Sequence, residues 1–87
     1  MALNSSALLD EVKTVLVETL AISDRAASID ANTELLGNLP ELDSMAVLEL
    51  VAALEQQFGI AVDDEDVTAE VFETLGSLTT FVAEKRN

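Results

Sequence analysis

The side chains that most often carry out catalysis are missing from this chain. It contains no histidine and no cysteine, which excludes Ser-His-Asp and Cys-His catalysis as well as the usual zinc sites. No glycine-rich phosphate-binding motif occurs. Paired carboxylates need a cleft that raises one pKa, and a small domain offers little room for one. The basic residues are scattered or terminal and form no phosphate clamp: Lys13, Arg25, Lys85 and Arg86. We therefore expect a protein that is not an enzyme.

Ser44 is the remaining candidate for chemistry because of its place in the chain. It follows Asp43 and begins a long segment with apolar residues at helical spacing. Asp43 suits the N-cap of that helix, since its side chain can accept hydrogen bonds from unpaired N–H groups. A phosphate ester on the Ser44 hydroxyl would lie at the positive end of the helix dipole. The same position also suits a serine with a purely structural role, so the residues alone leave both interpretations open.

An acidic run, Asp63-Asp64-Glu65-Asp66, raises the question of a metal site. A calcium-binding EF-hand loop requires regularly spaced oxygen ligands and a glycine at its sharp turn. Counted from Asp63, Val67 stands at a ligand position and Thr68 at the glycine position. We therefore predict no metal site and interpret the run as the solvated start of a short helix.

The spacing of apolar residues predicts the two longer helices. The first is expected over 6–20, with Ser5 or Ser6 as its cap. Its core residues would be Leu8, Val12, Val15, Leu16 and Leu20. The second begins at Ser44 and ends near Gly59, since glycine readily adopts the positive φ of a helix C-terminus. Its core face would be Val47, Leu50, Val51, Leu54 and Phe58.

The rest of the chain predicts two further helices and a long connection. A brief helix is expected over 65–70, and Thr74 would cap a final helix that ends in Lys85 and Arg86. The connection over 21–42 carries aliphatic residues that should fix it to the core: Ile22, Ile29, Leu35, Leu36, Leu39 and Leu42. We predict an all-α fold, a small four-helix bundle of three main helices plus a short third helix. Residues 1–87 would form a single domain with a long loop between helices one and two.

The charge of the chain bears on its partners. It has 17 acidic and 4 basic residues, a formal net charge of −13, so nucleic acids and anionic membrane surfaces would repel it. No apolar run approaches the roughly 20 residues that cross a bilayer, and 1–9 lacks the pattern of a secretory signal. We expect a cytoplasmic monomer. Its charge either keeps it soluble or steers it to basic partner surfaces.

Several segments together resemble the acyl carrier proteins. Around Ser44 they are Asp43-Ser44-Met45, Val47-Leu48-Glu49-Leu50-Val51 and Leu54-Glu55-Gln56-Gln57-Phe58-Gly59-Ile60. The upstream Thr33-Glu34-Leu35-Leu36 is also similar to the family, and so are the downstream Val62-Asp63-Asp64-Glu65 and Phe72-Glu73-Thr74-Leu75-Gly76-Ser77-Leu78. The resemblance covers most of this acidic chain.

The resemblance implies a cofactor, a site and partners. Ser44 would carry 4′-phosphopantetheine, attached by a separate phosphopantetheinyl transferase, and its thiol would hold an acyl group as a thioester. Partners in bacterial fatty-acid, lipid or specialised acyl metabolism would include acyl-transferring or ketosynthase-type enzymes with basic docking surfaces. The implied recognition face is Asp43, Met45, Leu48, Glu49, Ala52 and Glu55. Residues that would line a space for the acyl chain are Leu48, Ala52, Val62 and Leu78.

Some positions depart from the housekeeping fatty-acid carriers. Pro40-Glu41-Leu42 precedes the Asp-Ser pair where a glycine is frequent, and Gln56 and Gln57 stand where acidic residues are frequent. The stretch Pro40-Glu41-Leu42-Asp43-Ser44-Met45-Ala46-Val47 is more similar to accessory carriers that are found beside specialised bacterial surface or secretion systems. Two alternatives stay open: an aminoacyl or peptidyl carrier of the same fold, and a cofactor-free acidic interaction module.

Overall fold

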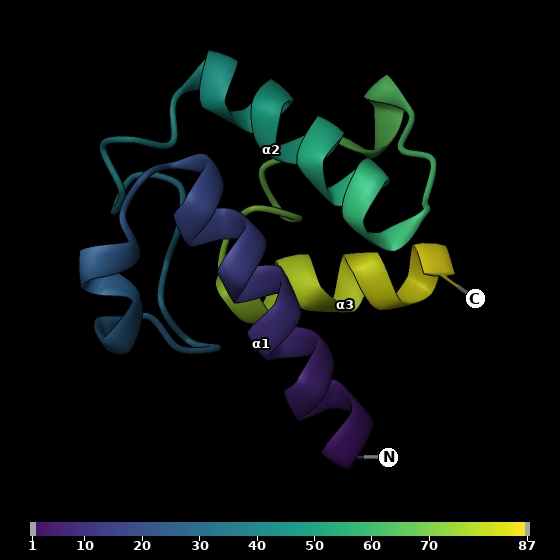
Figure 1. Cartoon of the computed structure of the whole chain (residues 1–87). Coiled ribbons are helices and arrows are strands. Elements are labelled where there is room, and N and C mark those ends of the chain that lie inside the picture. The colour runs from purple at the N-terminus through teal and green to yellow at the C-terminus, as the bar shows by residue number, and fades with distance from the viewer. Residues whose placement is uncertain (1, 87) are drawn as a thin grey trace.

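Three α-helices and two short 3-10 helices build the part of the chain that a computed structural model describes. It describes residues 2–86, with side chains from 7 to 86. The elements in order are α1 (Ala2–Thr19), η1 (Ser23–Ser28), α2 (Ser44–Phe58), η2 (Asp64–Asp66) and α3 (Leu75–Arg86). Helix α1 packs against both α2 and α3, which also contact each other (Figure 1). The predicted all-α class is confirmed, with three main helices, a short helical turn before the last one and a long first connection.

The core contains nearly all the aliphatic residues that were predicted for it in the first helix and the first connection. The five predicted core residues of α1 are buried, and five of the six aliphatic residues in the first connection are buried with them. Burial of these side chains fixes the connection to the helices. Leu36 is the exception, because 36% of it stays exposed.

The buried face of α2 is rotated slightly from the predicted one. Leu50 and Leu54 are buried as expected, but the third buried residue is Ala46. These three follow one another at intervals of four, so they form one stripe along the helix. Three predicted core residues lie beside this stripe and are only half-buried: Val47, Val51 and Phe58. The predicted helix end is correct, since Gly59 adopts the left-handed conformation with φ 65° and ψ 38°.

Two predicted boundaries were wrong. Helix α1 begins at Ala2, so the proposed caps Ser5 and Ser6 lie within it, and their side chains fall outside the described residues. Instead of a helix over 65–70, the chain makes only η2, which ends where Val67 turns extended (φ −84°, ψ 91°). The first turn of an α-helix fixes several residues for one hydrogen bond, so a helix of about six residues is not stable by itself.

The start of α3 is held by the predicted cap and by a partner that was not predicted. The Ser77 N–H donates to Thr74 Oγ1 over 3.0 Å, and the Thr74 N–H donates to Ser77 Oγ over 3.0 Å. Each hydroxyl thus satisfies a backbone donor of the other residue, the arrangement of a capping box. The predicted basic end is also present, with Lys85 and Arg86 in the last turn.

Backbone hydrogen bonds tie the first connection to the segment before α3. Glu34 and Thr74 form an isolated antiparallel bridge, and the Leu35 N–H donates to the Glu73 carbonyl over 2.9 Å. At the end of the contact the Gly76 N–H donates to the Ala31 carbonyl over 2.9 Å. A Cβ at Gly76 would lie 3.0 Å from that oxygen, so glycine allows the close approach.

Most of the few basic residues join parts of the fold. Lys85 Nζ lies 2.6 Å from Asp66 Oδ2; this hydrogen-bonded pair lowers the pKa of Asp66 and raises that of Lys85. The Arg86 guanidinium lies over the Phe58 ring, 5.7 Å from its centre. These contacts join the C-terminal end of α3 to η2 and α2.

None of the helices described between residues 2 and 86 is long and apolar enough to cross a membrane.

We expect added salt to stabilise this protein. Salt weakens the ion pairs, but it also screens the repulsion among 17 acidic residues, which outnumber the 4 basic ones. Raising NaCl from about 10 mM to about 0.15 M shortens the Debye length from about 30 Å to about 8 Å. The melting temperature, measured by circular dichroism, should rise by roughly 5 °C. An unchanged or lower melting temperature would show that the ion pairs dominate.

Candidate functional site

Ser44 is the first residue of α2 and is exposed to solvent. Asp43 precedes it in extended conformation, and its Oδ1 accepts a hydrogen bond from the Ala46 N–H over 2.8 Å. The predicted cap is therefore present, and it leaves the Ser44 and Met45 N–H groups without an intrahelical partner. Within the described part of the chain, the Ser44 hydroxyl makes no hydrogen bond of its own. It is thus an accessible oxygen at the positive end of a helix.

The approach to Ser44 is fixed from two sides. Leu39 and Leu42 are buried in the core, and Glu41 between them pairs with Arg25 of η1. The hydrogen bond from Arg25 is the main reason why the pKa of Glu41 is lowered. This short turn therefore joins η1 to the start of α2, which holds Ser44 in a defined position.

A mainly apolar groove lies beside Ser44. It has a volume of about 400 Å³ and runs between α2, the first connection and the segment after η2. We call it the serine groove; it is lined by Leu36, Ser44, Val47, Leu48, Val67, Thr68, Ala69 and Phe72. The sequence did not predict that residues between 67 and 72 form one wall of this groove, because a helix was expected over 65–70.

Most residues of the implied recognition face are accessible. Met45 and Leu48 are 73% and 64% exposed, which is unusual for large apolar side chains. Glu49 and Ala52 are exposed further along α2. Asp43 is exposed as well, although one of its carboxylate oxygens caps the helix.

Glu55 differs from the other members of that face, because its carboxylate serves the fold. Glu55 is half-buried, and its Oε2 accepts a hydrogen bond from the Val62 N–H over 2.8 Å. This bond fixes the link between the end of α2 and η2. Glu55 therefore has a structural role, and its part in partner recognition stays a prediction.

Removing the Glu55 carboxylate should destabilise the fold. In Glu55→Ala the half-buried Val62 N–H loses its acceptor, which should cost roughly 1–2 kcal/mol of the free energy of unfolding. Glu55→Gln keeps an acceptor oxygen and should lose less, and Gln56→Ala, on an exposed neighbour, should have almost no effect. Urea denaturation would measure all three. Equal stability of Glu55→Ala and the wild type would contradict this role.

The four residues expected to line an acyl-chain space differ in their surroundings. Leu48 lines the serine groove, whereas Ala52 borders a separate depression on α2 with Glu49 and Gln56. Leu78 is fully buried in the core, and Val62 is half-buried beside it in the link after α2. That these four residues line an acyl-chain space stays a prediction.

Comparisons with known proteins agree on one family. The model of a family described as "Phosphopantetheine attachment site" matches residues 10–82. An acyl carrier protein from Petrotoga mobilis is 30% identical over 81 residues, which cover 92% of this chain and 88% of that protein. The solution structure of a holo acyl carrier protein from Nitrosomonas europaea superposes with a TM-score of 0.82 and 47% identity, covering 88% of this chain and 93% of that one.

A helical domain with an accessible hydroxyl at a helix start, in a family defined by a phosphopantetheine attachment site, is a carrier of a covalently held group and not a catalyst. The chain belongs to the family of acyl carrier proteins. Its cofactor is a covalently attached 4′-phosphopantetheine. The resemblance inferred from the sequence is therefore confirmed.

Proposed function

We propose that the Ser44 Oγ is the attachment atom for 4′-phosphopantetheine. The observation that carries this proposal is the exposed hydroxyl at the first residue of α2, without a hydrogen bond to the described part of the protein. Two backbone N–H groups without intrahelical partners and the helix dipole favour a phosphate there. The apolar walls of the serine groove would suit an uncharged arm or acyl group. The residues at this position thus fit the cofactor.

Loading would join Ser44 Oγ to the phosphorus of the phosphopantetheine part of coenzyme A. The serine releases its proton to the solvent, and the bond from this phosphorus to the adenosine bisphosphate part breaks, so that adenosine bisphosphate leaves with the electron pair. The cofactor supplies the thiol that this cysteine-free chain lacks. The residues of the chain present the hydroxyl, fix the turn that bears it and leave its surroundings open.

Residues 1–87 would act as one carrier domain, because α1, α2 and α3 share a single core. A phosphopantetheinyl transferase and acyl-transferring or ketosynthase-type enzymes of acyl metabolism are the proposed partners. Their basic surfaces would dock on a face of α2 that combines apolar and acidic side chains: the exposed Asp43, Met45, Leu48, Glu49 and Ala52 and the half-buried Glu55. We place this exchange in the cytoplasm, where coenzyme A is available for loading.

Incubation with a phosphopantetheinyl transferase and coenzyme A tests the carrier function. The intact mass should increase by one phosphopantetheinyl group, and the loaded protein should show one titratable thiol where the unloaded chain has none. An unchanged mass with an active transferase, checked on a second carrier protein, would contradict the proposal.

A further inference from the structure

The turn that leads into Ser44 is tied to η1 by one charged pair. The Arg25 guanidinium donates a hydrogen bond to Oε2 of Glu41, which lies 16 residues away in the sequence. The other carboxylate oxygen, Glu41 Oε1, is buried. No other side chain among the described residues donates a hydrogen bond to this carboxylate. The bond from Arg25 lowers the pKa of Glu41, so the carboxylate is ionised at neutral pH and Arg25 compensates its charge.

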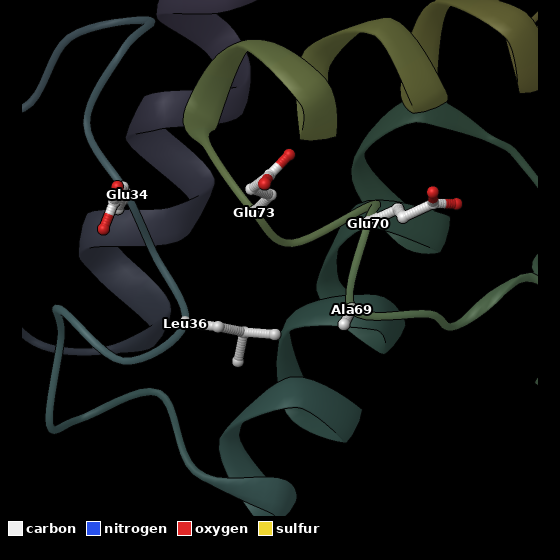
Figure 2. A pocket seen from close by; sticks show the side chains of 5 residues that line it. All are labelled: Glu34, Leu36, Ala69, Glu70 and Glu73. Carbon is white, nitrogen blue, oxygen red and sulfur yellow. The ribbon is translucent and has the colours of Figure 1, made fainter.

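The first connection is fixed upstream of this turn. The Leu36 N–H donates to the Phe72 carbonyl over 3.2 Å. Figure 2 shows the Leu36 side chain reaching toward Ala69 on the segment before α3. The stretch that leads to Ser44, residues 37–43, therefore starts from a fixed point.

Residues 37–43 have a single hydrogen bond to η1 in the described part of the protein, and it comes from the pair of Arg25 and Glu41. The side chains of Leu39 and Leu42 are buried in the core. The Leu42 N–H donates to the Leu39 carbonyl over 3.0 Å, which is a bond within the turn itself. The charged pair therefore limits the movement of the turn away from η1.

Loss of Arg25 would loosen this turn. A carboxylate with one buried oxygen and no compensating charge is unfavourable, so Glu41 would move toward water. Only two residues separate Glu41 from Ser44, so the serine would no longer be held in one position. Loading requires Ser44 Oγ to approach the phosphorus of coenzyme A in a defined geometry, and a small displacement of a reacting atom slows such a reaction.

We infer that Arg25 is a positioning residue for loading: by compensating Glu41 it keeps the turn closed and holds Ser44 Oγ where the phosphopantetheinyl transferase meets it. This inference rests on the proposed attachment at Ser44. The transferase binds the carrier with the turn closed. A carrier whose turn is open for most of the time therefore needs a higher concentration to be loaded at the same rate.

Arg25→Ala in the full chain tests the inference. The variant should fold, because both members of the pair are partly exposed and the buried leucines of the turn are unchanged. In loading by a phosphopantetheinyl transferase with coenzyme A, the KM for the carrier should rise about fivefold, with kcat changed by less than about twofold. Adding Glu41→Gln removes the uncompensated charge and should return KM to within about twofold of the wild type. A merely structural role would leave KM unchanged in a chain that is folded at the assay temperature.

A second measurement follows the turn itself. The Leu42 N–H donates within the turn, and its hydrogen exchange can be measured by NMR on the unloaded chain. Exchange should be at least about threefold faster in Arg25→Ala than in the wild type, because the turn opens more often. It should return close to the wild-type rate when Glu41→Gln is added. An unchanged exchange rate in Arg25→Ala would contradict the loosening of the turn.

Lys13→Ala is the matched charge control. Lys13 lies on α1 and forms no ion pair within the described residues. Its loss makes the chain more acidic by the same amount, which by itself favours a partner with a basic surface, so KM should stay the same or fall. An unchanged KM in Arg25→Ala, an increase that Glu41→Gln does not reverse, or an equal increase in Lys13→Ala would overturn the inference. Failure of the wild type to load would instead contradict the proposed function.

Discussion

Ser44→Ala should abolish loading while leaving the fold almost unchanged. The change removes the proposed acceptor atom, so the intact mass should stay that of the unloaded chain after incubation with coenzyme A and transferase. The Ser44 hydroxyl is exposed and makes no hydrogen bond within the described residues. Loss of a first-turn polar group should therefore cost at most on the order of 1 kcal/mol of the free energy of unfolding.

Ser77→Ala is the matched serine control. The Ser77 hydroxyl accepts a hydrogen bond from the Thr74 N–H and donates one to the Val71 carbonyl over 2.9 Å. Its removal should cost about 1 kcal/mol of stability and leave loading complete. The two serines should thus show opposite behaviour in the two measurements. Full loading of Ser44→Ala would show that another residue carries the group.

Leu50→Ala should have the largest effect on stability. Leu50 is fully buried in the middle of α2, and removing most of its side chain leaves a cavity where α2 meets the core. Such changes cost roughly 2–5 kcal/mol, a large part of the roughly 5–15 kcal/mol that stabilises a whole domain. Urea denaturation followed by circular dichroism would measure the loss.

Leu48→Ala provides the comparison on the same helix. It removes the same atoms from a side chain that is 64% exposed, so the free energy of unfolding should change by less than about 0.5 kcal/mol. The variant should instead weaken partner association, because Leu48 lines the serine groove. Similar stability losses for Leu48→Ala and Leu50→Ala would contradict the orientation of α2.

The long helices and the serine position could be predicted because local signals specify them. Asp43 caps α2 and Gly59 ends it, and each acts through its own backbone and nearest turn. The core face of α1 was also correct, since every helical turn repeats the same apolar spacing. The family resemblance then identified the cofactor, which no physical property of a serine could do.

The shape of the site could not be predicted because it depends on segments far apart in sequence. Leu36 resembles the other aliphatic residues of its connection, yet the bridge to Thr74 leaves it on the surface. Glu55 resembles any exposed helix glutamate until the Val62 N–H folds back onto it. The walls of the serine groove over 67–72 follow from tertiary packing and not from helix propensity.

The position of the cofactor is the most direct test of this description of the protein. The chain is loaded with a phosphopantetheinyl transferase and coenzyme A, digested, and its peptides are fragmented in a mass spectrometer. We predict that the phosphopantetheinyl group is found on Ser44 and on no other residue. Its presence on a different serine or threonine, with Ser44 unmodified, would contradict the assignment of this exposed hydroxyl at the start of α2.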